Sequence, residues 1–116
     1  MRSTISDDVF IVSPRTEYEG ATPFFDIVVP GASTVTDDST LEIVVSKNGK
    51  DVTSTRTSGS MAVANSTGSS PVVTTKTITG LVGGESLFIL VRGTVDGMLR
   101  TIVCFWLYVK KESGRD

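Results

Sequence analysis

The sequence predicts an all-β sandwich of about seven to eight antiparallel strands, and three observations lead to this prediction. Thr, Ser, Val and Gly dominate the composition, and these residues favour strands and turns. Short apolar runs alternate with turn sequences along the chain. No long stretch carries Ala, Leu, Glu and Lys at helical spacing. The 116 residues suffice for a single domain with its own core, and we expect residues 1–8 and 110–116 to be arms.

The first half of the chain contains three apolar runs that we predict as strands. Residues 9–13 and 24–29 are each followed by proline, which lacks an N–H and ends a strand. Residues 41–46 alternate apolar and polar side chains. Asn48-Gly49 then predicts a two-residue hairpin turn, because both residues tolerate positive φ. Residues 52–56, rich in Thr and Ser, are expected to form the returning edge strand.

The second half ends in the most apolar part of the sequence. Residues 59–64 and 72–78 are predicted as shorter strands. Asp96-Gly97 is again a two-residue turn, and it joins predicted strands at residues 87–95 and 98–109. Together these last two segments form a terminal hairpin.

Both faces of this terminal hairpin are apolar. Simple pairing across the turn places Phe88 opposite Phe105 on one face, with Leu90 and Leu107 nearby, and Leu87 opposite Trp106 on the other. A two-layer sandwich buries only one face of each sheet, so the second face needs a cover. That cover is either internal (the N-terminal segment, a long loop or a bulged register) or another subunit.

If a subunit is the cover, the hairpin supplies the candidate interface. Four fully buried side chains would contribute roughly 6–12 kcal/mol to binding, whereas association costs about 4–15 kcal/mol. A single contact of this kind is therefore weak, and many copies of it in an assembly would bind more strongly. The substitution Phe88→Asp or Phe105→Asp is then expected to abolish assembly. The candidate interface residues, taken from both faces, are Phe88, Leu90, Phe105, Leu107, Trp106 and Tyr108.

The residues that usually carry catalysis are scarce, so we expect no enzyme, no catalytic residues and no cofactor. The chain has no His, which removes the commonest general base. Its one cysteine, Cys104, lies in a strand pattern and is expected to be a small core residue. The glycines of residues 80–84 lack the Lys-Ser/Thr of a phosphate-binding loop.

The charge and the hydropathy of the chain also limit the classes of partner that we expect. The net charge is −2 and the chain has no basic run beyond Lys110-Lys111, so we expect no nucleic acid partner. No apolar run reaches 18 residues, so we expect no membrane span. Asp7-Asp8 and Asp37-Asp38 are either calcium ligands or ordinary turn residues, and the sequence leaves this open. Apart from that question, no metal site is expected.

Three short motifs carry a resemblance. The stretch from Ile78 through Gly80-Leu81 to Val91 resembles the corner before the long core strand of fibronectin type III and related Ig-like domains. Over residues 41–109 the chain is similar to small Ig-like proteins of tailed-bacteriophage virions. The motifs behind that similarity are Gly49-Lys50-Asp51-Val52-Thr53-Ser54, Ile78-Thr79-Gly80-Leu81 and Thr94-Val95-Asp96-Gly97.

This resemblance implies an Ig-like sandwich and a structural role. It implies a capsid decoration (cement) protein that stabilises the phage head, with the major capsid protein or other virion subunits as partners. Such a protein would form a homo-oligomer or lattice in the virion, assembled in the host cytoplasm. Two alternatives stay open. One is a tail or fibre adaptor; the other is a carbohydrate-binding or adhesive module with Trp106 and Tyr108 as an aromatic platform.

Overall fold

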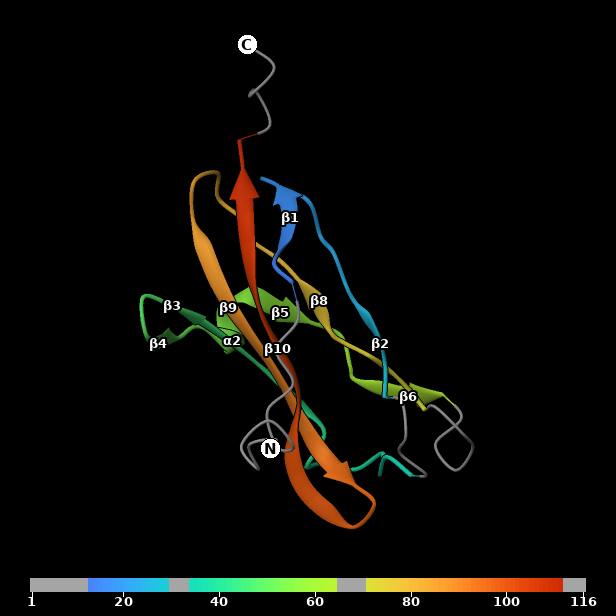
Figure 1. Ribbon diagram of the computed structural model, residues 1–116. Helices are drawn as coiled ribbons and strands as arrows, with labels where there is room; N and C mark the ends of the chain where they lie inside the picture. The colour runs from blue at the N-terminus through green and yellow to red at the C-terminus, as the bar shows by residue number, and fades with distance from the viewer. Residues whose placement is uncertain (1–12, 30–33, 65–70, 112–116) are drawn as a thin grey trace.

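Strands are the main regular structure of the chain, and they are joined by turns and irregular segments (Figure 1). The structure, a computed structural model, describes residues 13–29, 34–64 and 71–111. Within these ranges the strands form three sheets of five, three and two strands, and the helix is a single turn. The all-β prediction is therefore confirmed. No helix in these ranges is long and apolar enough to cross a membrane.

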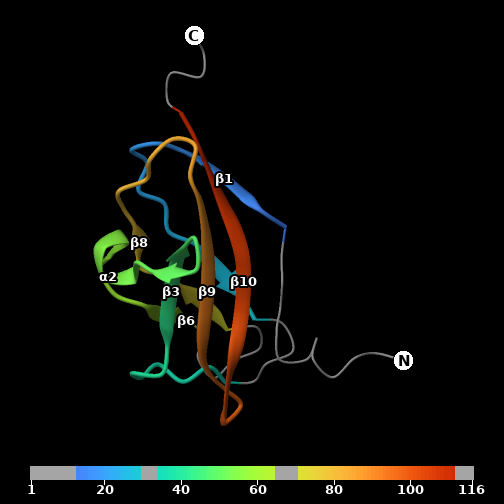
Figure 2. The ribbon, with the colours of Figure 1, turned by 90° about the vertical axis from the view of Figure 1, so that its left-hand side faces the viewer.

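The largest sheet has the strand order β1-β10-β9-β3-β4. Its centre is the long hairpin of β9 and β10, which dominates Figures 1 and 2. β1 runs parallel to β10, so the expectation of wholly antiparallel pairing is wrong at this edge. The strands are β1 (Arg15–Tyr18), β3 (Glu42–Lys47), β4 (Lys50–Asp51), β9 (Ser86–Val95) and β10 (Met98–Lys110).

The remaining strands form two smaller antiparallel sheets. One has the order β2-β7-β6, with β2 at Asp26–Val28, β7 at Val72–Thr74 and β6 at Ala62–Ala64. The other pairs β5 (Thr57–Ser58) with β8 (Thr77–Ile78). The segment predicted as one strand at residues 72–78 is thus two short strands in different sheets.

Both predicted hairpin turns are confirmed. Asn48 and Gly49 have φ of 53° and 79° and connect the paired residues at the ends of β3 and β4. Asp96 and Gly97 have φ of 49° and 84° and connect β9 to β10. Positive φ at both central residues is the requirement of a type I′ turn, which explains the choice of Asn-Gly and Asp-Gly.

The strand predicted at residues 52–56 is wrong, because the chain forms the helical turn α2 (Thr53–Arg56) there. Hydrogen bonds at Thr53 override the β propensity of the segment. Its N–H donates to Asp51 Oδ1 at 2.9 Å, and its hydroxyl oxygen accepts the Val45 N–H at 2.8 Å. The bonds from Thr53 also lower the pKa of the Asp51 carboxyl.

The core lies between the β9–β10 hairpin and the β2-β7-β6 sheet. Phe25, beside β2, meets Phe105 of β10 edge to face, with ring centroids 5.1 Å apart. Rings in this geometry attract one another beyond the burial of their area. The fully buried apolar side chains of the core come from both halves of the chain: Val35, Val45, Val73, Ile78, Leu87, Ile89, Val91 and Leu107.

Several sequence predictions fall outside the described residues. These are most of the predicted strand at residues 9–13, the arm at residues 1–8 and the pair Asp7-Asp8. The predicted strands at residues 24–29, 41–46 and 59–64 overlap with β2, β3 and β6, each with somewhat different bounds. At the other end, β10 continues to Lys110, where the C-terminal arm was expected to begin.

Candidate interaction surface

A β-bulge decides which side chains of the terminal hairpin face outward. Up to Thr101, β10 pairs with β9 in the register that the Asp96-Gly97 turn sets, and Thr101 lies opposite Arg92. The next pair along β9 is Val91 with Val103, so Ile102 is the extra residue. One extra residue moves every later side chain of β10 to the opposite face.

The bulge corrects the pairing expected from the sequence. Phe105 lies opposite Ile89 and not Phe88, and Leu107 lies opposite Leu87. Phe105 is 3% exposed and Leu107 is 0% exposed, and both belong to the core. These two candidate interface residues are therefore not available to another subunit.

The same shift places Trp106 and Tyr108 on the face turned away from the core. We call this the outer face and define it by Val44 of β3, Phe88 and Leu90 of β9, and Cys104, Trp106 and Tyr108 of β10, from the register that joins these strands.

Aromatic side chains form the exposed part of the outer face. Trp106 lies directly opposite Phe88, and their rings meet edge to face with centroids 5.1 Å apart. Trp106 is 44% exposed and Tyr108 is 42% exposed, whereas Phe88 and Leu90 are partly buried. Four of the six candidate residues, Phe88, Leu90, Trp106 and Tyr108, thus share one face, whereas the simple pairing placed Phe88 and Trp106 on opposite faces.

Polar groups bound the outer face on its β3 side. Arg92 of β9 pairs with Glu42 of β3 at 3.3 Å, and both side chains are about half exposed. Ser46 lies beside Phe88 in the register of β3. An apolar centre with a polar rim is the usual layout of a protein–protein interface.

Cys104 is the buried member of the outer face. It pairs with Leu90 and is 3% exposed, in agreement with the expected role as a small apolar residue. Burial raises the pKa of its thiol, which keeps it protonated and unreactive at neutral pH.

No protein-family model, curated protein or solved structure matches the chain.

An ion cluster centred on the buried Glu85 carboxylate links α2 to the large sheet. Arg56 donates two hydrogen bonds to the Glu85 carboxylate, each 2.8 Å long, and Lys47 Nζ lies 3.1 Å from the same carboxylate. The N–H of Val82 also donates to it at 2.8 Å. These bonds, led by those from Arg56, lower the pKa of Glu85 to about 2. This cluster was not predicted from the sequence, because nothing in the spacing of the three charged residues marks them as neighbours.

The aspartate pair at Asp37-Asp38 is a turn in this structure. Asp38 Oδ1 accepts hydrogen bonds from the Thr40 N–H at 2.9 Å and the Thr40 hydroxyl at 2.6 Å. These bonds lower the pKa of the Asp38 carboxyl. In the described ranges, no three Asp, Glu, Cys or His side chains gather in a group that could hold a metal ion.

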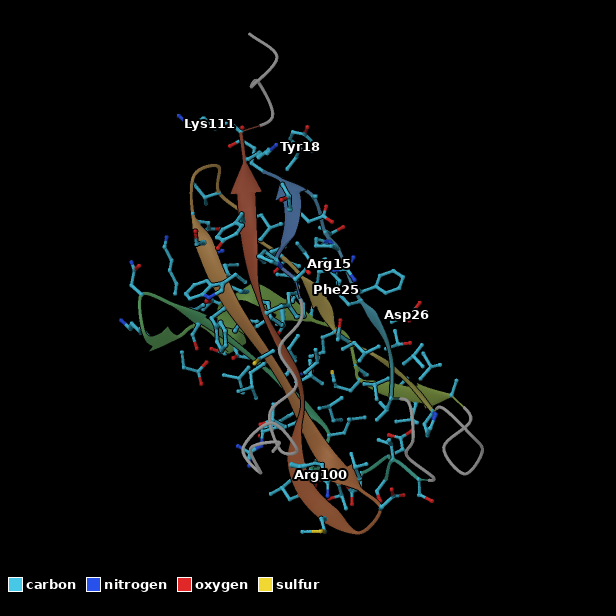
Figure 3. The ribbon with its side chains drawn as sticks, viewed as in Figure 1. Arg15, Tyr18, Phe25, Asp26, Arg100 and Lys111 are labelled. Atoms are coloured by element: carbon cyan, nitrogen blue, oxygen red, sulfur yellow. The ribbon has the colours of Figure 1, made fainter. Side chains whose placement is uncertain are left out.

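A pocket of about 340 Å³ opens at the edge where β2 faces β1 and β10. We call it the edge pocket. Arg15 of β1, residues 24–28, and Val103 and Phe105 of β10 line it. Figure 3 labels Arg15, Phe25 and Asp26 of this set. This pocket was not predictable because one of its walls is β1, whose charged and polar residues lack the apolar signal of a strand.

Proposed function

We propose that this chain is a non-enzymatic structural protein of a tailed-bacteriophage virion, a capsid decoration (cement) subunit built as an Ig-like sandwich. It would contact the major capsid protein or neighbouring virion subunits through the outer face. The observation that carries the proposal is this face, an aromatic surface on a sheet whose other side is already filled by the protein's own core.

Strand order supports the Ig-like part of the proposal. One sheet contains β3-β9-β10 and another contains β2-β7-β6. Lettering β2, β3, β6, β7, β9 and β10 as B to G gives C-F-G in one sheet and B-E-D in the other, the arrangement of Ig domains. The motifs behind the phage resemblance lie at the β3–β4 turn with α2, at the corner before β9, and at the β9–β10 turn.

The size of the outer face favours a contact repeated many times. Trp106 and Tyr108 already have more than half of their surface covered, and Phe88 and Leu90 more still. Burying the surface of these four side chains that is still exposed would contribute roughly 3 kcal/mol, which is below the association cost of about 4–15 kcal/mol. We therefore infer that the free protein is a monomer when dilute, and that it is held on a particle by several contacts at once.

Trp106→Asp is expected to remove the protein from purified particles. A carboxylate at the centre of an apolar contact loses its hydration without gaining a partner, which weakens binding by 10-fold or more, about 1.4 kcal/mol at least. The measurement is the amount of this chain that cosediments with particles, relative to the major capsid protein.

The matched control is Phe24→Asp, which introduces the same charge at a 57% exposed aromatic side chain beside β2, whose sheet contains none of the strands of the outer face. It should cosediment as the unsubstituted protein does. Equal loss in both variants, or none in Trp106→Asp, would refute the outer face as the attachment surface.

The two alternative functions, a tail or fibre adaptor and a carbohydrate-binding module, would give different results. Recovery of the chain with tails or fibres, and its absence from tail-free heads, would indicate the adaptor role. The adjacent exposed rings of Trp106 and Tyr108 are also the arrangement that a sugar-binding platform uses. Binding of the isolated monomer to a glycan array, lost in Trp106→Ala, would indicate that role.

A further inference from the structure

β2 leaves one edge of its sheet without a strand among the described residues. It pairs with β7 only, and the sheet order places it at the end. The backbone of Phe25 accepts the Thr75 N–H, and the Val29 N–H donates to Pro71. In an antiparallel pair the bonded residues alternate, so Phe25, Ile27 and Val29 bond to β7. The N–H and C=O groups of Asp26 and Val28 therefore point to the open edge.

The edge pocket lies beside this open edge. Phe25 and Ile27 line it from β2, and Val103 and Phe105 line it from β10. A strand added to β2 would direct every second side chain toward these apolar groups, because side chains alternate along a strand. A free strand edge next to a pocket with apolar side chains in its wall is the layout that binds an extended peptide.

The chain carries a suitable peptide close to the pocket. Arg15 lines the pocket, and the sequence Val9-Phe10-Ile11-Val12 precedes it by only three residues. Three extended residues span about 10 Å. A segment tethered this closely has an effective concentration of about millimolar, which favours it over a peptide free in solution.

We propose that residues 9–12 of the same chain bind to the open edge of β2 as an added strand, with alternate side chains in the edge pocket. The added strand pairs the Asp26 and Val28 backbone groups and covers the partly exposed side chains of Phe25 and Ile27. It also blocks an edge that would otherwise pair with other chains. This inference concerns a different surface from the outer face and does not depend on the phage assignment.

The test is hydrogen–deuterium exchange at the Asp26 and Val28 amides in the full-length chain. Both should be protected, and the double variant Phe10→Asp/Ile11→Asp should make them exchange roughly tenfold faster or more, because charges at both positions exclude the segment in either register. The amides of β9 should keep their exchange rates, which shows that the domain stays folded. The control Thr4→Asp/Ile5→Asp adds the same charges at the same spacing and should change neither set.

Two results would overturn the proposal. One is rapid exchange at Asp26 and Val28 in the unsubstituted protein, or exchange that the Phe10→Asp/Ile11→Asp variant leaves unchanged. The other is protection that disappears on dilution, since that would assign the added strand to a second copy. Protection that is independent of protein concentration supports the segment of the same chain.

Discussion

Replacing Phe105 with alanine is expected to lower the free energy of unfolding by about 3–5 kcal/mol. The ring is 3% exposed, and it meets Phe25 across the core with centroids 5.1 Å apart. Its removal leaves a cavity between two sheets that cannot fully close. Chemical denaturation at neutral pH measures the loss. Phe105→Asp places an unpaired charge in the same site and is expected to prevent folding.

The neighbouring residue provides the control. Trp106→Ala removes a larger side chain that is 44% exposed, and it should cost about 1 kcal/mol. The contrast tests the bulge at Ile102, because a regular register would place Trp106 with Leu87 in the core and Phe105 outside. A larger cost for Trp106→Ala than for Phe105→Ala would contradict the bulged register.

Glu85→Gln is expected to lower the free energy of unfolding by about 3 kcal/mol at neutral pH. The Glu85 side chain is 4% exposed, and the substitution leaves Arg56 without its carboxylate partner. In the folded protein the pKa of Glu85 is lowered from the ordinary value of 4.5 to about 2, which means that folding stabilises the ionised carboxylate. Because the folded pKa is the lower one, this stabilisation is complete above pH 4.5 and disappears as the pH falls toward 2.

The measurement is the free energy of unfolding as a function of pH for both proteins. The difference between Glu85→Gln and the unsubstituted protein should be largest near neutrality and should shrink below the ordinary pKa of a glutamate. Glu42→Gln removes the exposed pair with Arg92 and should change stability by less than about 1 kcal/mol. A similar, pH-independent cost for both variants would show that the buried cluster does not stabilise the fold.

The turns and the general class of fold were predictable from the sequence. Asn48-Gly49 and Asp96-Gly97 act locally, because the positive φ that they tolerate is what a two-residue hairpin needs. The apolar runs identified β3, β9 and β10, since their side chains pack on the core. In each case the residues that predict the turn or strand are the residues that form it.

The outer face was predictable only in part. The sequence showed that both sides of the hairpin are apolar, and this is the case. It did not show the bulge, because Ile102 sits in a continuous apolar run, where one extra residue leaves the pattern unchanged. Phe105 and Leu107 were therefore assigned to the wrong side.

The remaining differences arise from contacts between distant parts of the chain. Thr53 is drawn into α2 by bonds to Asp51 and to Val45, eight residues earlier. β1 is an edge strand whose pairing with β10 joins residues more than ninety positions apart, and it carries little apolar signal of its own. Single-sequence patterns report local preferences and do not contain such pairings.

The outer face as the attachment surface is best tested by oxidative footprinting of Trp106 and Tyr108. Mass spectrometry would compare the rate at which each ring is oxidised in the free protein and on purified particles. Both rings should react readily in the free protein and become protected on the particle, while Phe24, 57% exposed beside β2, keeps its rate. Unchanged oxidation of Trp106 and Tyr108 on the particle would contradict attachment through this face.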